Sequence, residues 1–202
     1  MAICPLDLPG ISRGKPLDKI GQRPLNQGEI FFDDAHLPKQ YMIVTPGPAS
    51  ETAERGSGLF GGAGLPMGSM AVMFGGLARA ALDEAIKYAR HRIQGGVPII
   101  EHKNIKLKLF EMFMMTESAR SLARRLQLYN YMSGSSSMVH TMAGKWMSTE
   151  TAFKVASEAI QIFGGNGLSR EHVIEKIFRD ARAAMIEDGT NEVLALSVAD
   201  EL

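Results

Sequence analysis

The stretch "TMAGKWMSTETAFKVASEAIQIFGGNG", residues 141–167, decides how the second half of this chain folds. Its apolar residues recur at steps of three, four or seven, the spacing of one face of an α-helix. The run stops at the glycines of "GGNG", a strong signal for the end of a helix. The stretch therefore predicts one long amphipathic helix, whose apolar stripe contains Met142, Trp146, Phe153, Ala156, Ile160 and Phe163.

The same helical period extends toward the N-terminus. Residues 105–126 carry a second apolar stripe with Lys, Glu and Arg opposite, and the linker "SGSSS" at 133–137 separates this segment from the first. A further helix is predicted at 66–92, with Pro66 in its first turn. Its glycines and alanines are small enough to let neighbouring helices approach closely.

Two shorter helices are predicted after residue 167. Ser169 is a plausible N-cap for one of them, with Glu171 in its first turn. The last helix is predicted to start near Gly189 or Thr190. Three long and two short helices together indicate an all-α, up-and-down bundle.

Residues 1–48 have a different character, rich in Pro, Gly and Asp, with the short apolar runs "MAIC", "EIFFDD" and "YMIV". These runs are typical of strands joined by turns. The next residues, 49–65, are too rich in Gly, Pro and Ser for regular structure. We therefore predict a mainly α protein with three parts: a partial antiparallel β-domain at 1–48, a connector at 49–65, and a helical bundle domain at 66–202.

Composition narrows the class of protein. The 22 acidic and 22 basic side chains balance, which gives no electrostatic reason to expect nucleic acid or a membrane surface as partner. The single cysteine excludes an internal disulfide, and the five histidines show no metal-site spacing. No run approaches the length of apolar sequence that spans a bilayer. A cytoplasmic protein without a metal is expected.

Two charged positions admit more than one interpretation from local physics. The adjacent acids Glu187 and Asp188 stand just before a predicted helix, where acids favour the positive end of the helix dipole, and one of them is also a candidate catalytic base. Arg92 ends the helix 66–92, where a cation suits the negative end. Capping would explain all three residues without any catalytic role.

Four segments, taken in order, resemble blocks of the C-terminal half of acyl-CoA dehydrogenases, a family of flavoproteins. The first is similar to the later part of the family's middle β-domain, and the others to its C-terminal helical domain. The segments are "DKIGQRPLNQGEIFFDDAHLP" (18–38), "ARAALDEAIKYARHR" (78–92), "QIFGGNG" (161–167) and "RDARAAMIEDGTNE" (179–192).

The resemblance implies the α,β-dehydrogenation of an acyl-CoA thioester to the 2-enoyl-CoA, with FAD as the cofactor. A carboxylate takes the α-proton in such enzymes, and in one large branch it is the residue directly before Gly-Thr. That position is Asp188 here, one methylene shorter than the usual Glu. The resemblance also implies that Glu187 and Gly189 line the substrate pocket.

The remaining implied roles concern FAD. Arg92 matches an arginine that reaches the FAD pyrophosphate of a neighbouring subunit. Gln161, with the backbone of Gly164 and Gly165, matches the block at the ADP part. The list is completed by Thr190, which matches a residue that hydrogen-bonds FAD, and by Glu192, which stands where the family often has Gln.

The resemblance further implies a homo-oligomer, dimer or tetramer, formed through the bundle. It also implies an electron-transfer flavoprotein or similar electron acceptor. Because it covers only the second half of such enzymes, we expect a C-terminal fragment that is inactive alone. The alternative is a non-catalytic relative that keeps the bundle as an oligomerisation or binding module, which Gly95, Glu192 and Asp200 favour because they depart from the family pattern.

Overall fold

The computed structural model describes residues 2–42, 64–133 and 137–202. The chain separates into two compact units, Met1–Gly62 and Ala63–Leu202, and each is described by itself. Most of the predicted connector lies outside the described residues, although Gly64 and Leu65 already belong to a helix. The boundaries at 48 and 65 stay predictions.

The first unit contains a small antiparallel ladder. Strand β1 (Ile11–Arg13) pairs with β2 (Ile30–Phe32), with Ile11 opposite Phe32. Strand β2 lies within the run "EIFFDD", as predicted, whereas β1 was not anticipated because three residues are too few for an alternating pattern. The three β2 side chains are all exposed.

The other two runs form a bridge with each other and no longer strand in the described residues, and half of "YMIV" lies outside those residues. In "MAIC" only Ala2 takes part in β-structure, as an isolated bridge to Met42. In "YMIV", Tyr41 ends the 3₁₀ helix η1 (Lys39–Tyr41), and residues 43 and 44 lie outside the described chain. The amides of Tyr41 and Met42 donate to Pro38 and Lys39 within this turn, and the carbonyl of Tyr41 accepts from the amide of Ile3 at 2.9 Å, so the pairing is limited to this bridge.

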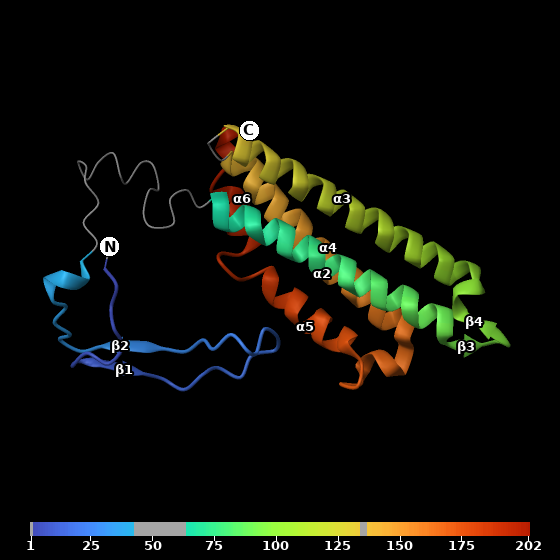
Figure 1. The fold of residues 1–202 in the computed structure, drawn as a ribbon, viewed down its shortest axis with the longest axis horizontal. Coiled ribbons are helices and arrows are strands. Elements are labelled where there is room, and N and C mark those ends of the chain that lie inside the picture. Colours follow the sequence, from blue (N-terminus) through green and yellow to red (C-terminus); the bar gives the residue numbers. More distant parts are fainter. Residues whose placement is uncertain (1, 43–63, 134–136) are drawn as a thin grey trace. The chain divides into compact units, whose positions relative to one another are not determined.

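Three long helices of the second unit run side by side in alternating directions (Figure 1). The fold class predicted from the sequence is thereby confirmed. The long helices are α2 (Gly64–His91), α3 (Lys103–Ser133) and α4 (Met138–Phe163), and the short ones are α5 (Val173–Ala184) and α6 (Asn191–Leu196).

Small residues let these helices pack closely. Most alanines of α2 and α4, such as Ala81 and Ala156, are fully buried, and a Cβ added at Gly144 would lie 2.9 Å from Cδ2 of Leu126 on α3. The stripe predicted on α3 is buried over most of its length. Residues of the common core include Ala78, Ala81, Ala85, Met112, Ala152, Ala156, Ala159, Ile174 and Ile177.

One part of the predicted stripe on α4 is wrong. Met142, Ala156 and Phe163 are buried, but Trp146 is 37% exposed and its neighbour Lys145 is 0% exposed. The buried face runs 142, 145, 149, 152, 156, 159 and 163, so it carries a lysine and a threonine among apolar residues. The predicted helical period is confirmed, but the prediction that Trp146 belongs to the buried face is wrong.

Short elements join the helices. A hairpin of β3 (Ile93–Gln94) and β4 (Val97–Pro98) with η2 (Ile99–Glu101) joins α2 to α3, and η3 (Gly164–Leu168) follows α4. The last element is η4 (Ala199–Glu201). Over the described residues, none of the helices combines the length and the apolar character that crossing a membrane requires.

The prediction of Ser169 as the N-cap of α5 is wrong. The helix begins at Val173, and its N-cap is His172. The hydroxyl of Ser169 instead accepts from the backbone amide of Glu171, and the backbone carbonyl of Ser169 accepts from the amide of His172. Ser169 therefore closes a separate turn after η3.

Candidate functional site

The loop between α5 and α6 presents Asp188 in an unusual backbone conformation. Its φ is +53°, in the left-handed region, and Gly189 follows with φ +105°. Aspartate tolerates this region better than most residues, and only glycine suits the next position, where a Cβ would lie 3.0 Å from Cδ2 of Leu194. Asp188 itself is exposed.

Thr190 is the N-cap of α6, one residue before the first helical position. Its Oγ1 accepts from the amide of Val193 at 3.4 Å. The start of this helix, predicted near Gly189 or Thr190, is therefore confirmed within about a residue. Neither acid occupies the cap position, so the capping interpretation of Glu187 and Asp188 does not describe this turn.

Lys145 lies beneath the loop and holds it. Its ammonium donates to the carbonyl oxygens of Glu187 at 3.0 Å and Gly189 at 2.5 Å, the two residues that flank Asp188. Burial lowers the pKa of Lys145, while the negative charges of Glu187, Asp188 and Glu192 oppose that shift. The sequence analysis missed this residue, although a lysine on the buried face of α4 was a signal that could have found it.

A second buried contact ties the loop to α4. The Asn191 side chain is 2% exposed, and its Nδ2 donates to Thr149 Oγ1 at 3.0 Å. The Thr149 hydroxyl in turn donates to the carbonyl of Lys145 at 3.0 Å. The backbone amide of Asn191 also donates to the backbone carbonyl of Met185, so the two ends of the loop are joined.

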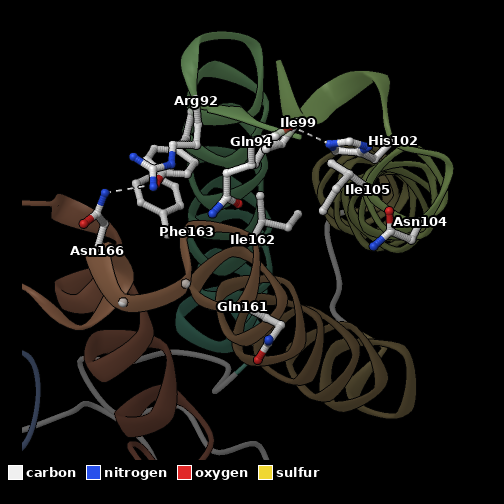
Figure 2. Close-up of a pocket in the computed structure, with 13 residues that line it drawn as sticks. Arg92, Gln94, Ile99, His102, Asn104, Ile105, Gln161, Ile162, Phe163 and Asn166 are labelled. Carbon is white, nitrogen blue, oxygen red and sulfur yellow. Dashed lines mark hydrogen bonds between the residues drawn. The ribbon is translucent and has the colours of Figure 1, made fainter. Parts of the chain in front are cut away.

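A pocket of about 570 Å³ lies where α2 ends and α4 ends (Figure 2). Arg92, Gln161, Gly164 and Gly165 line it, so four residues predicted to bind the cofactor come together. Its floor is ordered by aromatic packing, since the Tyr88 and Phe163 rings stack with centroids 4.0 Å apart. Asn166 donates to the Tyr88 hydroxyl at 3.0 Å.

The polar groups of this pocket are available to a ligand. Within the described part of the chain, the guanidinium of Arg92 and the amide of Gln161 have no side-chain hydrogen bond or ion pair. A Cβ added at Gly165 would meet nothing within 4 Å, so the backbone there faces open space. The site offers a cation and bare backbone, which suit an anionic ligand.

The hairpin beside this pocket explains one departure from the family pattern. Gly95 and Gly96 form its two-residue turn with φ +63° and +83°, a geometry that glycine adopts without strain. A Cβ at Gly95 would lie 3.4 Å from the His102 ring, whose Nε2 pairs with the carbonyl of Gln94 at 3.0 Å. An imidazole therefore lines the pocket close to Gly95.

The predicted site residues fall into two groups at opposite ends of the bundle (Figure 1). Lys145, under the Asp188 loop, and Gln161, in the pocket, are 16 residues apart on α4, which corresponds to roughly 24 Å along the helix. Glu187, Gly189, Thr190 and Glu192 belong to the loop group. A single described bundle does not bring Asp188 and Arg92 to one site.

The family model of the acyl-CoA dehydrogenase C-terminal domain matches residues 67–202 of this chain. The chain belongs to the acyl-CoA dehydrogenase family. This confirms the resemblance inferred from its four sequence blocks.

Similar proteins cover nearly all of this chain. The short-chain specific acyl-CoA dehydrogenase of Rattus norvegicus, described as mitochondrial, is 33% identical over 99% of this chain and 47% of the rat protein. The structure of butyryl-CoA dehydrogenase from Megasphaera elsdenii is 32% identical, with a TM-score of 0.84 over 99% of this chain and 50% of that one. A structure titled as an electron transferring flavoprotein of Acidaminococcus fermentans is 28% identical, with a TM-score of 0.84 over 98% of this chain and 51% of that one.

The chain spans about half the length of the curated relatives it matches. The part that is matched is nevertheless enough to show the family and the fold of this chain.

Proposed function

We propose that the protein carrying this chain is an FAD-dependent acyl-CoA dehydrogenase in which Asp188 is the base. The observation that carries this proposal is an exposed carboxylate, directly before Gly-Thr, held in a left-handed backbone conformation by a buried network in a member of this family. An exposed carboxylate on an anchored loop is available to a substrate and has a defined direction.

Asp188 would take the proton from the α-carbon of the acyl-CoA thioester onto a carboxylate oxygen. FAD, when bound, supplies the acceptor for the hydride that leaves the β-carbon. Gly189 and the partly buried Glu187 would line the substrate side of the loop. Because aspartate is one methylene shorter than glutamate, the loop must approach the substrate more closely to place the base.

The residues in the pocket fit the diphosphate and adenosine part of FAD. Among the described residues, Arg92 supplies a cation without an ion pair and Gln161 a side-chain amide without a hydrogen bond, and the backbone of Gly164 and Gly165 is uncovered. At the other end of the bundle, the Thr190 hydroxyl can donate to the cofactor while its oxygen caps α6. Glu192, in the first turn of α6, is exposed beside this loop.

The separation of these groups supports a homo-oligomer, dimer or tetramer, in which one chain provides Asp188 and another provides Arg92 for the same FAD. An electron-transfer flavoprotein or similar protein would then reoxidise the flavin. The cytoplasmic location expected from the sequence stays a prediction.

The proposed function is tested with the protein expressed from its complete gene. Butyryl-CoA is the first substrate to try, because the Megasphaera relative is named for it. Asp188→Asn keeps the side-chain shape and tolerates a positive φ, so we expect a folded, flavin-containing protein with kcat lowered by about 10² to 10⁴-fold. Dye reduction by an artificial electron acceptor measures it.

Asp83→Asn is the matched control, since Asp83 is exposed on α2 and pairs only with Arg79 among the described contacts. It should leave kcat unchanged. Unchanged turnover in Asp188→Asn would exclude Asp188 as the base. A wild-type protein with neither flavin absorbance nor turnover would favour the alternative of a non-catalytic binding or oligomerisation module.

A further inference from the structure

Lys145 is the largest fully buried side chain in the described part of the chain. Lysine is almost never fully buried without partners, because removing an ammonium from water is costly. The other buried residues of α4 are apolar or small and neutral, so Lys145 is the one buried charge among them. The contacts of its ammonium therefore indicate what the residue does.

Both oxygens that the ammonium contacts belong to the peptide units around Asp188. The carbonyl of Glu187 precedes Asp188, and that of Gly189 follows it. Fixing the two carbonyls restricts the backbone on either side of a residue whose φ of +53° lies in the sparsely populated left-handed region. Without this anchor, the loop could relax to other conformations.

The contacts also place a positive charge under a cluster of acids. Glu187, Asp188 and Glu192 are the charged groups that face Lys145 from the loop and from α6. On its own helix, the neutral hydroxyl of Thr149 donates to the backbone carbonyl of Lys145 and accepts from the Asn191 side chain. The buried ammonium thus attracts the carboxylate of Asp188 toward the protein while holding the backbone that carries it.

We propose that Lys145 is a positioning residue, whose ammonium binds the carbonyls of Glu187 and Gly189 and so sets the direction of the Asp188 carboxylate. This inference rests on the proposed function of Asp188 as the base. A loosened loop would spread the carboxylate over many positions, and an error of about 1 Å costs about 10²-fold in rate.

The test replaces Lys145 in the protein from its complete gene. Lys145→Met keeps the length of the side chain and removes all donors, whereas Lys145→Arg keeps a charged donor. Lys154→Met, at an exposed position of α4, is the matched control. We expect Lys145→Met to lower kcat per bound flavin by about 10 to 100-fold, with KM changed only a few-fold, and Lys145→Arg to recover part of that loss.

A second readout does not depend on turnover. Amide hydrogen exchange of residues 186–191 should be faster in Lys145→Met than in wild type, while exchange in the middle of α3 stays unchanged. A role limited to general stability would instead raise exchange throughout the bundle and lower the flavin content, without changing kcat per flavin.

The proposal is overturned if Lys145→Met leaves either kcat per flavin or loop exchange at the wild-type value. If Lys145→Met does not fold, Lys145→Gln decides, because its shorter, neutral side chain cannot reach both carbonyls: unchanged kcat per flavin and unchanged loop exchange in that variant would overturn the proposal. Asp188→Asn reports separately on the proposed function. An active Asp188→Asn with a loosened loop in Lys145→Met would reject Asp188 as the base and keep Lys145 as the loop anchor.

Discussion

Asp188 occupies a backbone conformation that selects the residues around it. A positive φ is tolerated by aspartate and asparagine, whose short polar side chains stabilise it locally, and disfavoured for longer or branched residues. Gly189 extends the same turn, and Thr190 ends it by capping α6. The three consecutive residues therefore have structural reasons to be there in addition to a catalytic one.

The titration of Lys145 gives a prediction on the alkaline side. Burial holds the pKa of Lys145 below 10.5, so the unfolded chain keeps the proton to higher pH than the folded chain. The free energy of unfolding of wild type, relative to Lys145→Met, should therefore rise as pH increases from the lowered pKa to about 10.5. Below the lowered pKa this increment is absent.

The turnover of wild type should fall as pH increases over the same interval, because Lys145 loses its positive charge beneath the Asp188 loop. Lys145→Arg, whose guanidinium stays protonated, should keep its turnover to higher pH. Urea unfolding and kcat measured at matched pH values check both expectations. Parallel stability curves for wild type and Lys145→Met would contradict them.

At the scale of elements, two glycines of η3 have different roles: Gly165 lines the pocket, and Gly167 packs against the end of α4. A Cβ at Gly167 would lie 2.8 Å from the carbonyl oxygen of Ile160 and 2.9 Å from Cβ of Phe163, whereas one at Gly165 meets nothing within 4 Å. Gly167→Ala should therefore lower the free energy of unfolding by about 1–3 kcal/mol.

Gly165→Ala is its matched control for folding and a test of the pocket. We expect a change in stability below about 1 kcal/mol, because the backbone is unstrained and the methyl has room. The same methyl enters the pocket beside Gln161, so FAD should bind more weakly. Urea unfolding and flavin retention on dilution measure the two effects. Equal destabilisation by both substitutions would contradict this division.

The elements also show how far the sequence allowed prediction. The long helices were predictable because their buried faces repeat over many turns, as from Ile105 to Leu126. Trp146 was assigned to the buried stripe and Lys145 was not predicted to be buried, since hydrophobicity alone cannot reveal two backbone carbonyls that satisfy a buried ammonium. Ser169 failed as an N-cap because one residue type serves both turns and helix starts.

At the scale of the whole molecule, the candidate site is divided between the ends of one bundle. Order along the chain identified Asp188, Arg92 and Gln161 but gave no distance between them. The length of α4 puts the two groups roughly 24 Å apart. If both serve one FAD, two chains must contribute to it, and this has a direct genetic test.

Subunits that carry different defects should complement one another. Asp188→Asn leaves Arg92 intact, and Arg92→Met leaves Asp188 intact, so a mixed dimer contains one site with both functional residues and one with neither. Random mixing of equal amounts should restore about one quarter of the wild-type sites, although each variant alone has little activity.

The mixture is prepared by co-expression with two affinity tags, and kcat is measured on both the unselected mixture and the doubly tagged oligomer. A doubly tagged dimer should reach about one half of the wild-type value, because one of its two sites is intact. The double variant Asp188→Asn/Arg92→Met, paired with wild type, is the control for assembly, because in that mixed dimer each site lacks one of the two residues and neither site is intact. Activity in the mixed oligomer no higher than the sum of the separate variants would mean that one chain supplies both residues. The shared-site arrangement would then be wrong, whereas the role of Asp188 would still be decided by its own variant.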